Sequence, residues 1–284
     1  MSKTVIMPLP ARDFDPSEAA LSWQRLVQDG HRVRFATPDG KPAAADPLML
    51  SGEGLDFWGF IPLLKKFKLL GLMLRAKANA RAAYRAMERD AEFLAPLRYD
   101  ALNVADFNGL LLPGGHWSRG MREYLEDARL QAFVGAFFAS GKPVAAICHG
   151  VVLAARARRA DGRSALYGKR TTALTWKLES SAFSLMRFLG RFWNPAYYRT
   201  YSEVRGEPRG YRSVQAEVTR ELASPEHFQD APASDFRKSS GLFRDSATDA
   251  RPAFVVIDGV YISARWPGDA HSFAARFSQM VTRR

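Results

Sequence analysis

The segment 143–150, PVAAICHG, constrains the fold more than any other part of the chain, because it sets a lone cysteine between a strand pattern and a helix pattern. The apolar run from Val144 to Ile147 has the length of a buried parallel strand, and the sequence VVLAARARRA after Gly150 favours a helix. Small residues two positions before and after Cys148 allow a sharp strand-to-helix turn, since a bulkier side chain there would meet neighbouring backbone. Such a turn presents Cys148 at the carboxyl edge of a sheet, where the helix N-terminus favours the thiolate. An ordinary small core residue is the alternative interpretation.

Length and composition fit one large α/β domain with insertions, or two small domains. The chain has 284 residues, 47% of them hydrophobic and 25% charged, which is enough to bury a sizeable core. With Cys148 as the only cysteine, no disulfide can form within the chain, as is usual in a reducing compartment. The N-terminus has no signal-peptide pattern, and the longest uncharged apolar run, at 57–64, is shorter than the roughly 20 residues of a membrane span. We therefore expect a cytoplasmic protein with no transmembrane segment.

The formal net charge of +12 is concentrated in two segments. Residues 57–89 contain eight Lys or Arg against one acid, a local charge of +7, and residues 151–212 contain thirteen against four, a local charge of +9. Basic segments of this kind bind nucleic acid, anionic lipid or anionic substrates in some proteins and are solvated surface in others.

Alternating strand and helix patterns predict an α/β fold with a doubly wound, mostly parallel sheet and helices on both faces. Residues 3–9 form a strand pattern, a helix pattern follows to Gly30, and 31–37 alternates as a second strand. A βαβ unit of this length implies a parallel sheet. Later strands are expected at 107–112, 144–147, 212–219, 253–258 and 260–264, with helices at 123–140 and at the end of the chain.

Residues 56–98 interrupt this alternation and predict a helical insertion within a single domain of residues 1–284. The segment is helical by propensity and broadly amphipathic, with Gly71 near the break between two helices. We expect the insertion to act as a cap over one edge of the sheet. A basic amphipathic helix lying on a membrane is the alternative.

Two further elements place candidate catalytic groups at the edge of the sheet that carries Cys148. The loop PGGH at 113–116 follows a strand, so the backbone N–H groups of Gly115 and His149 form a candidate oxyanion hole. Glu18 begins the first helix, and a carboxyl held protonated there can donate a hydrogen bond to sulfur and act as general acid or base. His149 is a candidate base or charge partner for the thiol. Each feature also has a purely structural interpretation. The PGGH loop can be an ordinary Gly-Gly turn, Glu18 an acid in the first turn of a helix, and His149 a helix cap.

The motifs DFDPSE, LLLPGGH, PVAAICHG and SARWPGDAH resemble the ThiJ/PfpI family, over nearly the whole chain. The resemblance implies the class I glutamine amidotransferase-like fold, a flavodoxin-like sandwich that is usually dimeric. It also implies Cys148 as nucleophile, His149 beside it and Glu18 as a buried acid, with no cofactor. Members include glyoxalase III-type enzymes that convert methylglyoxal to lactate, stress chaperones, isocyanide hydratases and proteins described as intracellular peptidases. The enlarged cap is similar to the chaperone and glyoxalase branch.

The chain departs from this family pattern in the third member of the Cys-His-acid triad. The chaperone and glyoxalase branch has an Asp downstream of the Cys where this chain reads TALTWKLE, with Glu179 as the nearest acid. The peptidase branch takes a Glu from just after the glycine pair, for which Glu123 and Glu126 are the candidates. A further candidate pair is Asp269 and His271, with a surface loop as the alternative. The triad acid is therefore open, and protease activity is the weaker inference.

Other chemistries find less support in the sequence. The amidotransferases of this fold use a distant His-x-Glu pair, whereas His271 is followed two places later by Phe273. No HExxH, CxxC or P-loop pattern occurs, and five scattered histidines with one cysteine do not indicate a metal site. We expect neither a metal nor a cofactor.

Three hypotheses of function follow from these features. The first is a cofactor-independent cysteine enzyme, in which the Cys148 thiolate adds to a small reactive carbonyl substrate and water releases a hydroxy acid. The second is a holdase-type stress chaperone that uses the aromatic, basic stretch 183–201, with an intracellular cysteine peptidase or hydrolase as a further family alternative. The third is binding of nucleic acid or an anionic membrane through the basic segments. The resemblance adds the expectation of a homodimer.

Overall fold

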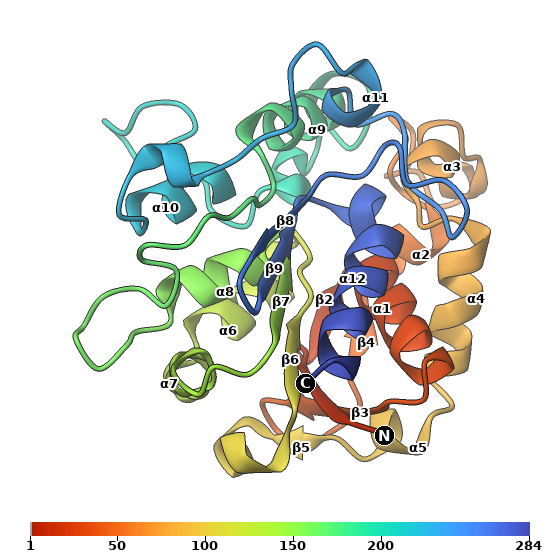
Figure 1. Ribbon diagram of the computed structural model, residues 1–284. Helices are drawn as coiled ribbons and strands as arrows, with labels where there is room; N and C mark the ends of the chain where they lie inside the picture. The colour runs from red at the N-terminus through yellow and green to blue at the C-terminus, as the bar shows by residue number, and fades with distance from the viewer. Residues whose placement is uncertain (1) are drawn as a thin grey trace.

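The computed structural model describes residues 2–284, and its centre is a seven-stranded sheet (Figure 1). In spatial order the strands are β5 (Leu97–Arg98), β3 (Arg32–Thr37), β1 (Thr4–Pro8), β6 (Gly109–Leu112), β7 (Val144–Ile147), β9 (Tyr261–Ala264) and β8 (Val255–Asp258). All neighbouring pairs are parallel except β8 and β9, which form an antiparallel hairpin at one edge. The predicted α/β fold with a mostly parallel sheet is confirmed.

Helices cover both faces of the sheet, as Figure 1 shows. One layer contains α1 (Pro16–Gln28), α4 (Ala78–Met87) and α12 (Ala270–Thr282), and the other contains α6 (Ser118–Glu126), α7 (Ala128–Ala139) and α8 (Gly150–Arg156). Because side chains alternate along a strand, β1 supplies both cores. Val5 and Met7 pack with the first layer, whereas Ile6 packs with the second. Because both faces of the sheet are buried, the sequences of these strands are continuous apolar runs.

Two sequence-based assignments outside the sheet are wrong. The expected strand at 212–219 is helix α10 (Val214–Arg220), because Ser213 caps it and the two valines four residues apart, Val214 and Val218, bury one helical face. The expected single helix at 123–140 is two helices, α6 and α7, separated at Asp127. The carboxylate of Asp127 accepts hydrogen bonds from the first N–H groups of α7.

The inserted segment is less helical at its start than expected. Regular helices are α3 (Leu70–Leu74), α4 and α5 (Ala91–Leu94), and the break falls at 75–77. Gly71 lies inside α3, where a Cβ would come 2.1 Å from the carbonyl oxygen of Gly52, so close packing explains this glycine. Since α4 packs beside α1, the second half of the segment belongs to a helix layer (Figure 1). The single-domain organisation stays a prediction.

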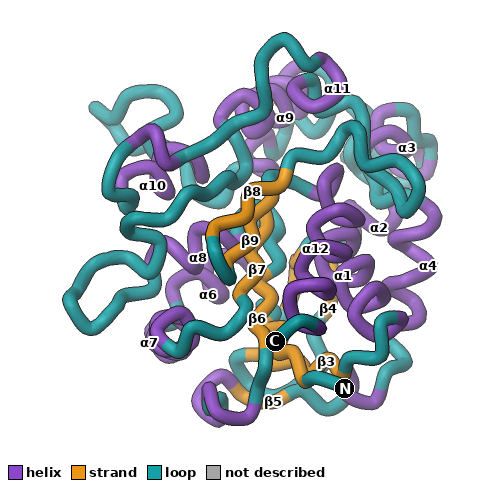
Figure 2. The backbone as a smooth tube through the Cα atoms, in the orientation of Figure 1, coloured by secondary structure: helices purple, strands orange, loops and turns teal. Residues whose placement is uncertain are grey.

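Several further elements lie near the carboxyl ends of the strands. They are β2 (Arg12–Phe14), β4 (Ala44–Ala45), α2 (Pro47–Ser51), α9 (Trp176–Phe188), the short 3₁₀ helix η4 (Pro195–Tyr198), α10 and α11 (Phe236–Ser239). Figure 2 shows that most of the chain between α8 and β8 is loop with short helices. Among the described residues, no helix is long and apolar enough to cross a lipid bilayer.

Candidate active site

Cys148 lies at the tip of the turn between β7 and α8 and has a left-handed backbone, with φ at +56°. A non-glycine residue in this region is strained, and such strain persists only where the surroundings hold it. Here the N–H of Cys148 donates to the carbonyl oxygen of Ala264 at 3.1 Å. A Cβ on Gly150 would come 2.1 Å from the carbonyl oxygen of Leu112, so no larger residue fits after the turn. The sharp turn inferred from the sequence is present, but Cys148 is only 5% exposed.

Glu18 reaches the thiol from the first turn of α1. Its side chain is fully buried, and Oε2 accepts a hydrogen bond of 2.8 Å from the N–H of Gly114. Asp15 caps the helix and orients this turn through the N–H groups of Ser17 and Glu18. Burial, followed by the charge of Asp15, raises the pKa of Glu18 well above its ordinary value. Burial therefore favours the protonated form of this carboxyl group, which lies beside the sulfur.

Gly114 brings the loop after β6 against the Cys148 turn. A Cβ on this residue would lie 2.7 Å from the nitrogen of His149, 3.0 Å from Cβ of Cys148 and 3.0 Å from Oε2 of Glu18. Glycine at this position therefore lets the three groups meet. The N–H of Gly114 is already used by Glu18, whereas the N–H of His149 faces the sulfur. The oxyanion role of Gly115 and His149 stays a prediction.

The thiol of Cys148 does not have the low pKa expected at a helix N-terminus. Burial raises its pKa first, and the charges of Glu18 and Asp15 raise it further, while the N–H of His149 lowers it. The helix that follows, α8, is only two turns long, so its dipole is weak against this burial. A thiolate is therefore favoured only while Glu18 carries the proton, because two buried negative charges would repel each other.

His149 supplies a neutral imidazole whose tautomer is set by Thr200. The hydroxyl of Thr200 donates its single proton to the carbonyl oxygen of His116 at 2.8 Å, so it accepts from Nε2 of His149 at 2.9 Å. The lone pair of His149 then lies on Nδ1, 3.5 Å from the sulfur of Cys148. Burial lowers the pKa of His149 to about 3. This geometry suits a relay of the thiol proton and not a permanent positive charge.

None of the residues considered as the third triad member or its partner bonds to His149 in the described residues. Glu179 accepts from Arg199 and from the backbone of Val214, and Asp269 is paired with buried Arg265. The other three lie elsewhere: Glu126 accepts from Tyr201, His271 contacts Asn79, and Glu123 is exposed. Thr200 is hydrogen-bonded to Nε2 of His149, where the acid of a triad would bind. The sequence does not predict this contact, because a threonine 51 residues from His149 carries no local signal.

A cover of aromatic side chains closes the site. The ring of His116 stacks on Tyr198 at 4.3 Å and meets the edge of Tyr197 at 4.6 Å. Tyr197 donates a hydrogen bond of 2.7 Å to Asp46, the cap of α2, whose pKa burial raises to about 7. Burial also lowers the pKa of His116 to about 3, so its imidazole is neutral. The cover joins η4 to the start of α2, and Thr200 connects the backbone of His116 to the imidazole of His149.

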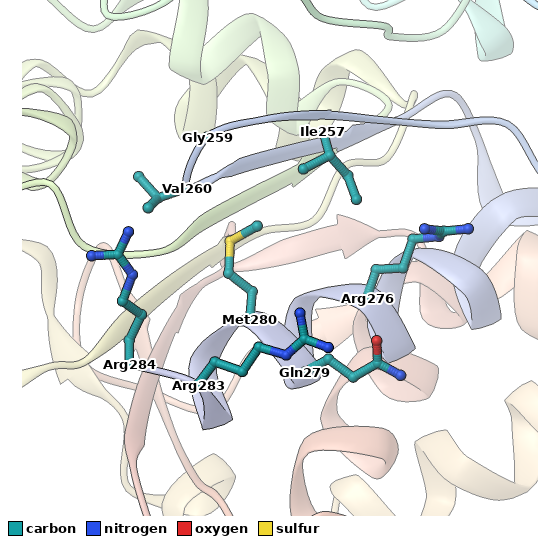
Figure 3. A pocket seen from close by; sticks show the side chains of 8 residues that line it. All are labelled: Ile257, Gly259, Val260, Arg276, Gln279, Met280, Arg283 and Arg284. Atoms are coloured by element: carbon teal, nitrogen blue, oxygen red, sulfur yellow. The ribbon is translucent and has the colours of Figure 1, made fainter.

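An open cavity of about 470 Å³ lies elsewhere, between the β8–β9 hairpin and the end of α12 (Figure 3). Its lining contains Arg276, Arg283 and Arg284 but no thiol, carboxyl or imidazole side chain. It therefore lacks the acid–base groups that surround Cys148. Within residues 2–284, no cluster of three or more His, Cys, Asp or Glu side chains has the arrangement of a metal site.

Comparison with known proteins identifies a matching family and several similar proteins. A family model described as ThiJ/PfpI family-like matches residues 9–208. General stress protein 18 of Bacillus subtilis is 41% identical over 75 residues, which cover 26% of this chain and 42% of that protein. Protein/nucleic acid deglycase 2 of Escherichia coli is 46% identical over 65 residues, which cover 22% of this chain and 36% of that protein. The chain thus matches less than half the length of these two relatives.

Two solved structures share the fold over nearly their full length. Glyoxalase III from Candida albicans superposes with a TM-score of 0.58, covering 99% of this chain and 96% of that chain at 13% identity. DJ-1beta of Drosophila melanogaster superposes with a TM-score of 0.51, covering 100% and 92% at 15% identity. Likeness at this level of identity concerns the fold alone.

Proposed function

The chain belongs to the ThiJ/PfpI family, and from that premise we propose that it is a cysteine-dependent enzyme acting on a small reactive carbonyl compound, such as an α-oxoaldehyde. The observation that carries the proposal is the buried cluster in which strained Cys148 lies beside the carboxyl of Glu18, whose pKa burial raises, and 3.5 Å from Nδ1 of His149. The names of two similar proteins, a glyoxalase III and a deglycase, support a carbonyl compound as the first substrate to assay.

The reaction begins when the sulfur of Cys148 adds to the aldehyde carbon. Nδ1 of His149, which faces the sulfur at 3.5 Å, relays the thiol proton to the carbonyl oxygen as the C–S bond forms, so that no imidazolium accumulates. The developing alkoxide accepts hydrogen bonds from backbone N–H groups at the turn and takes up a proton. The product of this step is a hemithioacetal, with a new C–S bond to Cys148.

The hemithioacetal then rearranges without an external oxidant. A base removes the proton from the former aldehyde carbon, and the neighbouring keto carbon receives a proton in return. The first carbon is thereby oxidised to the level of a thioester and the second is reduced to an alcohol. Water cleaves the thioester C–S bond, which releases a 2-hydroxy acid and restores the thiol. Glu18 and His149 are the groups near the sulfur that carry these protons.

The closed site favours a small substrate over a peptide. Cys148, Glu18 and His149 are all buried, and the rings of Tyr197 and Tyr198 lie above His116. A peptide bond would require the whole cover between η4 and α2 to move away. A compound of a few carbon atoms needs only a transient opening of the same cover.

The proposal is tested with methylglyoxal as substrate. We expect the wild-type chain to form lactate without added cofactor, and Cys148→Ser to lower the rate roughly 10³-fold or more. A Ser17→Ala variant, next to Glu18 but without a role in proton transfer, serves as the matched control and keeps its activity. Circular dichroism and melting curves establish that both variants fold. Lactate formation that persists in Cys148→Ser would sink the mechanism.

A further inference from the structure

The molecule has one concentrated apolar surface that the proposed reaction does not use. Twelve of the twenty large apolar side chains that are exposed in the described residues come from 57–73 and 188–192. Leu63 is the most prominent, with 83% of its area exposed, followed by Leu69, Phe188, Phe67 and Leu189. We call these exposed side chains of the two segments the Leu63 surface. Single exposed apolar side chains are ordinary, but a group of this size marks an interaction site.

The two segments form one surface, although more than a hundred residues separate them in the sequence. Asp56 and Gly190 pair across an isolated β-bridge. Phe192 contacts Phe57 with ring centroids 4.8 Å apart and Phe60 with centroids 5.7 Å apart. In Figure 1 the α3 and α9 labels both lie at the end of the molecule away from the chain termini. The two segments therefore lie side by side.

Buried residues beneath the Leu63 surface hold it on the fold. The buried carboxylate of Asp56 accepts hydrogen bonds from the N–H groups of Leu69, Leu70 and Gly71, which anchors the start of α3. The inner side chains of α3 and α9 pack in one small core with Tyr197, the ring that covers His116. The exposed side chains are thus held outward on a supported element, next to the cover of the candidate active site.

Positive charges accompany the apolar side chains, and negative charges do not. Lys65 and Lys66 lie among the most exposed apolar residues, and Arg187 precedes Phe188. Within the described residues none of these three cations is in an ion pair, whereas Lys68 pairs with Glu53 at 3.6 Å. Neither 57–73 nor 187–193 contains an acid.

We propose that the Leu63 surface binds the anionic face of a lipid bilayer. Protruding Leu and Phe side chains enter the boundary between headgroups and acyl chains, while the lysines and Arg187 meet lipid phosphates. The aromatic residues Trp58 and Trp193 flank the surface, and tryptophan favours the interface between membrane and water. This inference stands independently of the proposed reaction.

Charge argues against a second copy of the chain as the occupant. A two-fold contact through this surface brings each patch against itself. Lys65 and Lys66 of one copy would then lie near those of its partner, with no acid in the patch to compensate. An anionic bilayer complements both the apolar and the cationic components.

Vesicle flotation tests the proposal. We expect the full chain to float with vesicles of phosphatidylcholine and phosphatidylglycerol, and to float much less with phosphatidylcholine alone. Lys65→Glu with Lys66→Glu weakens the binding about tenfold or more, since each cation near an anionic membrane contributes about fivefold. Leu63→Glu with Phe67→Glu abolishes it. Matched controls are Arg283→Glu with Arg284→Glu, and Val27→Glu with Leu94→Glu, which make the same kinds of change at exposed sites elsewhere and keep binding within about twofold.

Three results would overturn the proposal. The first is no flotation of the wild-type chain, or equal losses in the control variants. The second is a dimer, seen by sedimentation, that dissociates in Leu63→Glu with Phe67→Glu while vesicles do not bind. The third is suppression of client-protein aggregation that needs Leu63 and Phe67 without any vesicle binding. Methylglyoxal turnover by the same variants separates this test from the proposed reaction, because surface variants leave Cys148 in place.

Discussion

The surroundings of Cys148 and the Leu63 surface lie near each other, but they depart from the usual burial of side chains in opposite ways. Around Cys148, polar groups such as Glu18 and His149 are buried. On the Leu63 surface, large apolar groups are exposed. Both arrangements cost free energy, because an isolated chain is more stable with the polar groups in water and the apolar groups in the core. Each therefore indicates a function outside the needs of folding.

The two regions differ in how closely neighbouring atoms surround each residue. At the Cys148 turn, glycines and hydrogen bonds leave little freedom, because a Cβ on Gly114 or on Gly150 would lie less than 3 Å from neighbouring backbone atoms. On the Leu63 surface, side chains such as Leu63 meet mainly solvent. Substitutions are therefore expected to affect stability strongly in the first region and weakly in the second.

Gly150→Ala gives the largest effect on stability that we expect from a substitution in the Cys148 turn. A methyl group 2.1 Å from the carbonyl oxygen of Leu112 forces β6 and α8 apart, which we expect to destabilise the fold by about 3 kcal/mol. Urea denaturation measures the change. Gly162→Ala is the control, because no atom lies within 4 Å of its Cβ position and only its positive φ opposes the substitution. Equal destabilisation in the two variants would contradict the tight turn.

Thr200→Val gives an intermediate effect, on turnover. The variant leaves the buried N–H at Nε2 of His149 without an acceptor, which costs about 1–3 kcal/mol and frees the imidazole to change tautomer. We expect methylglyoxal turnover to fall about tenfold to a hundredfold. Thr200→Ser keeps the hydroxyl and is the control. If valine and serine at this position give the same turnover, Thr200 does not orient His149.

Leu63→Asn gives the smallest effect. The side chain is exposed, so we expect the free energy of unfolding to change by no more than about 0.5 kcal/mol and turnover to stay at the wild-type rate. Leu111→Ala, in the buried strand β6, is the matched contrast and should cost about 2–5 kcal/mol. Urea denaturation of both variants measures the difference. A large loss of stability in Leu63→Asn would mean that the Leu63 surface is part of the core.

Local patterns in the sequence predict the parts of the site that depend on short-range structure. The turn at Cys148 follows from small residues around one cysteine, and the position of Glu18 follows from a helix that starts after Asp15. Thr200 could not be found this way, because it reaches His149 through a long irregular segment. Helix α10 was missed because β-branched residues favour strands, while here Val214 and Val218 repeat with the period of a helix.

The central claim, that Glu18 carries the proton while Cys148 reacts, is tested most directly by two rates measured on Glu18→Gln. Glutamine mimics the neutral carboxyl as a hydrogen-bond donor but cannot transfer a proton. We predict that alkylation of Cys148 by iodoacetamide at neutral pH stays within about threefold of the wild-type rate, while methylglyoxal turnover falls about a hundredfold or more. Alkylation that becomes tenfold faster in the variant would show that Glu18 is ionised in the wild type, since removing its charge would lower the pKa of Cys148. Unchanged turnover would contradict the account altogether.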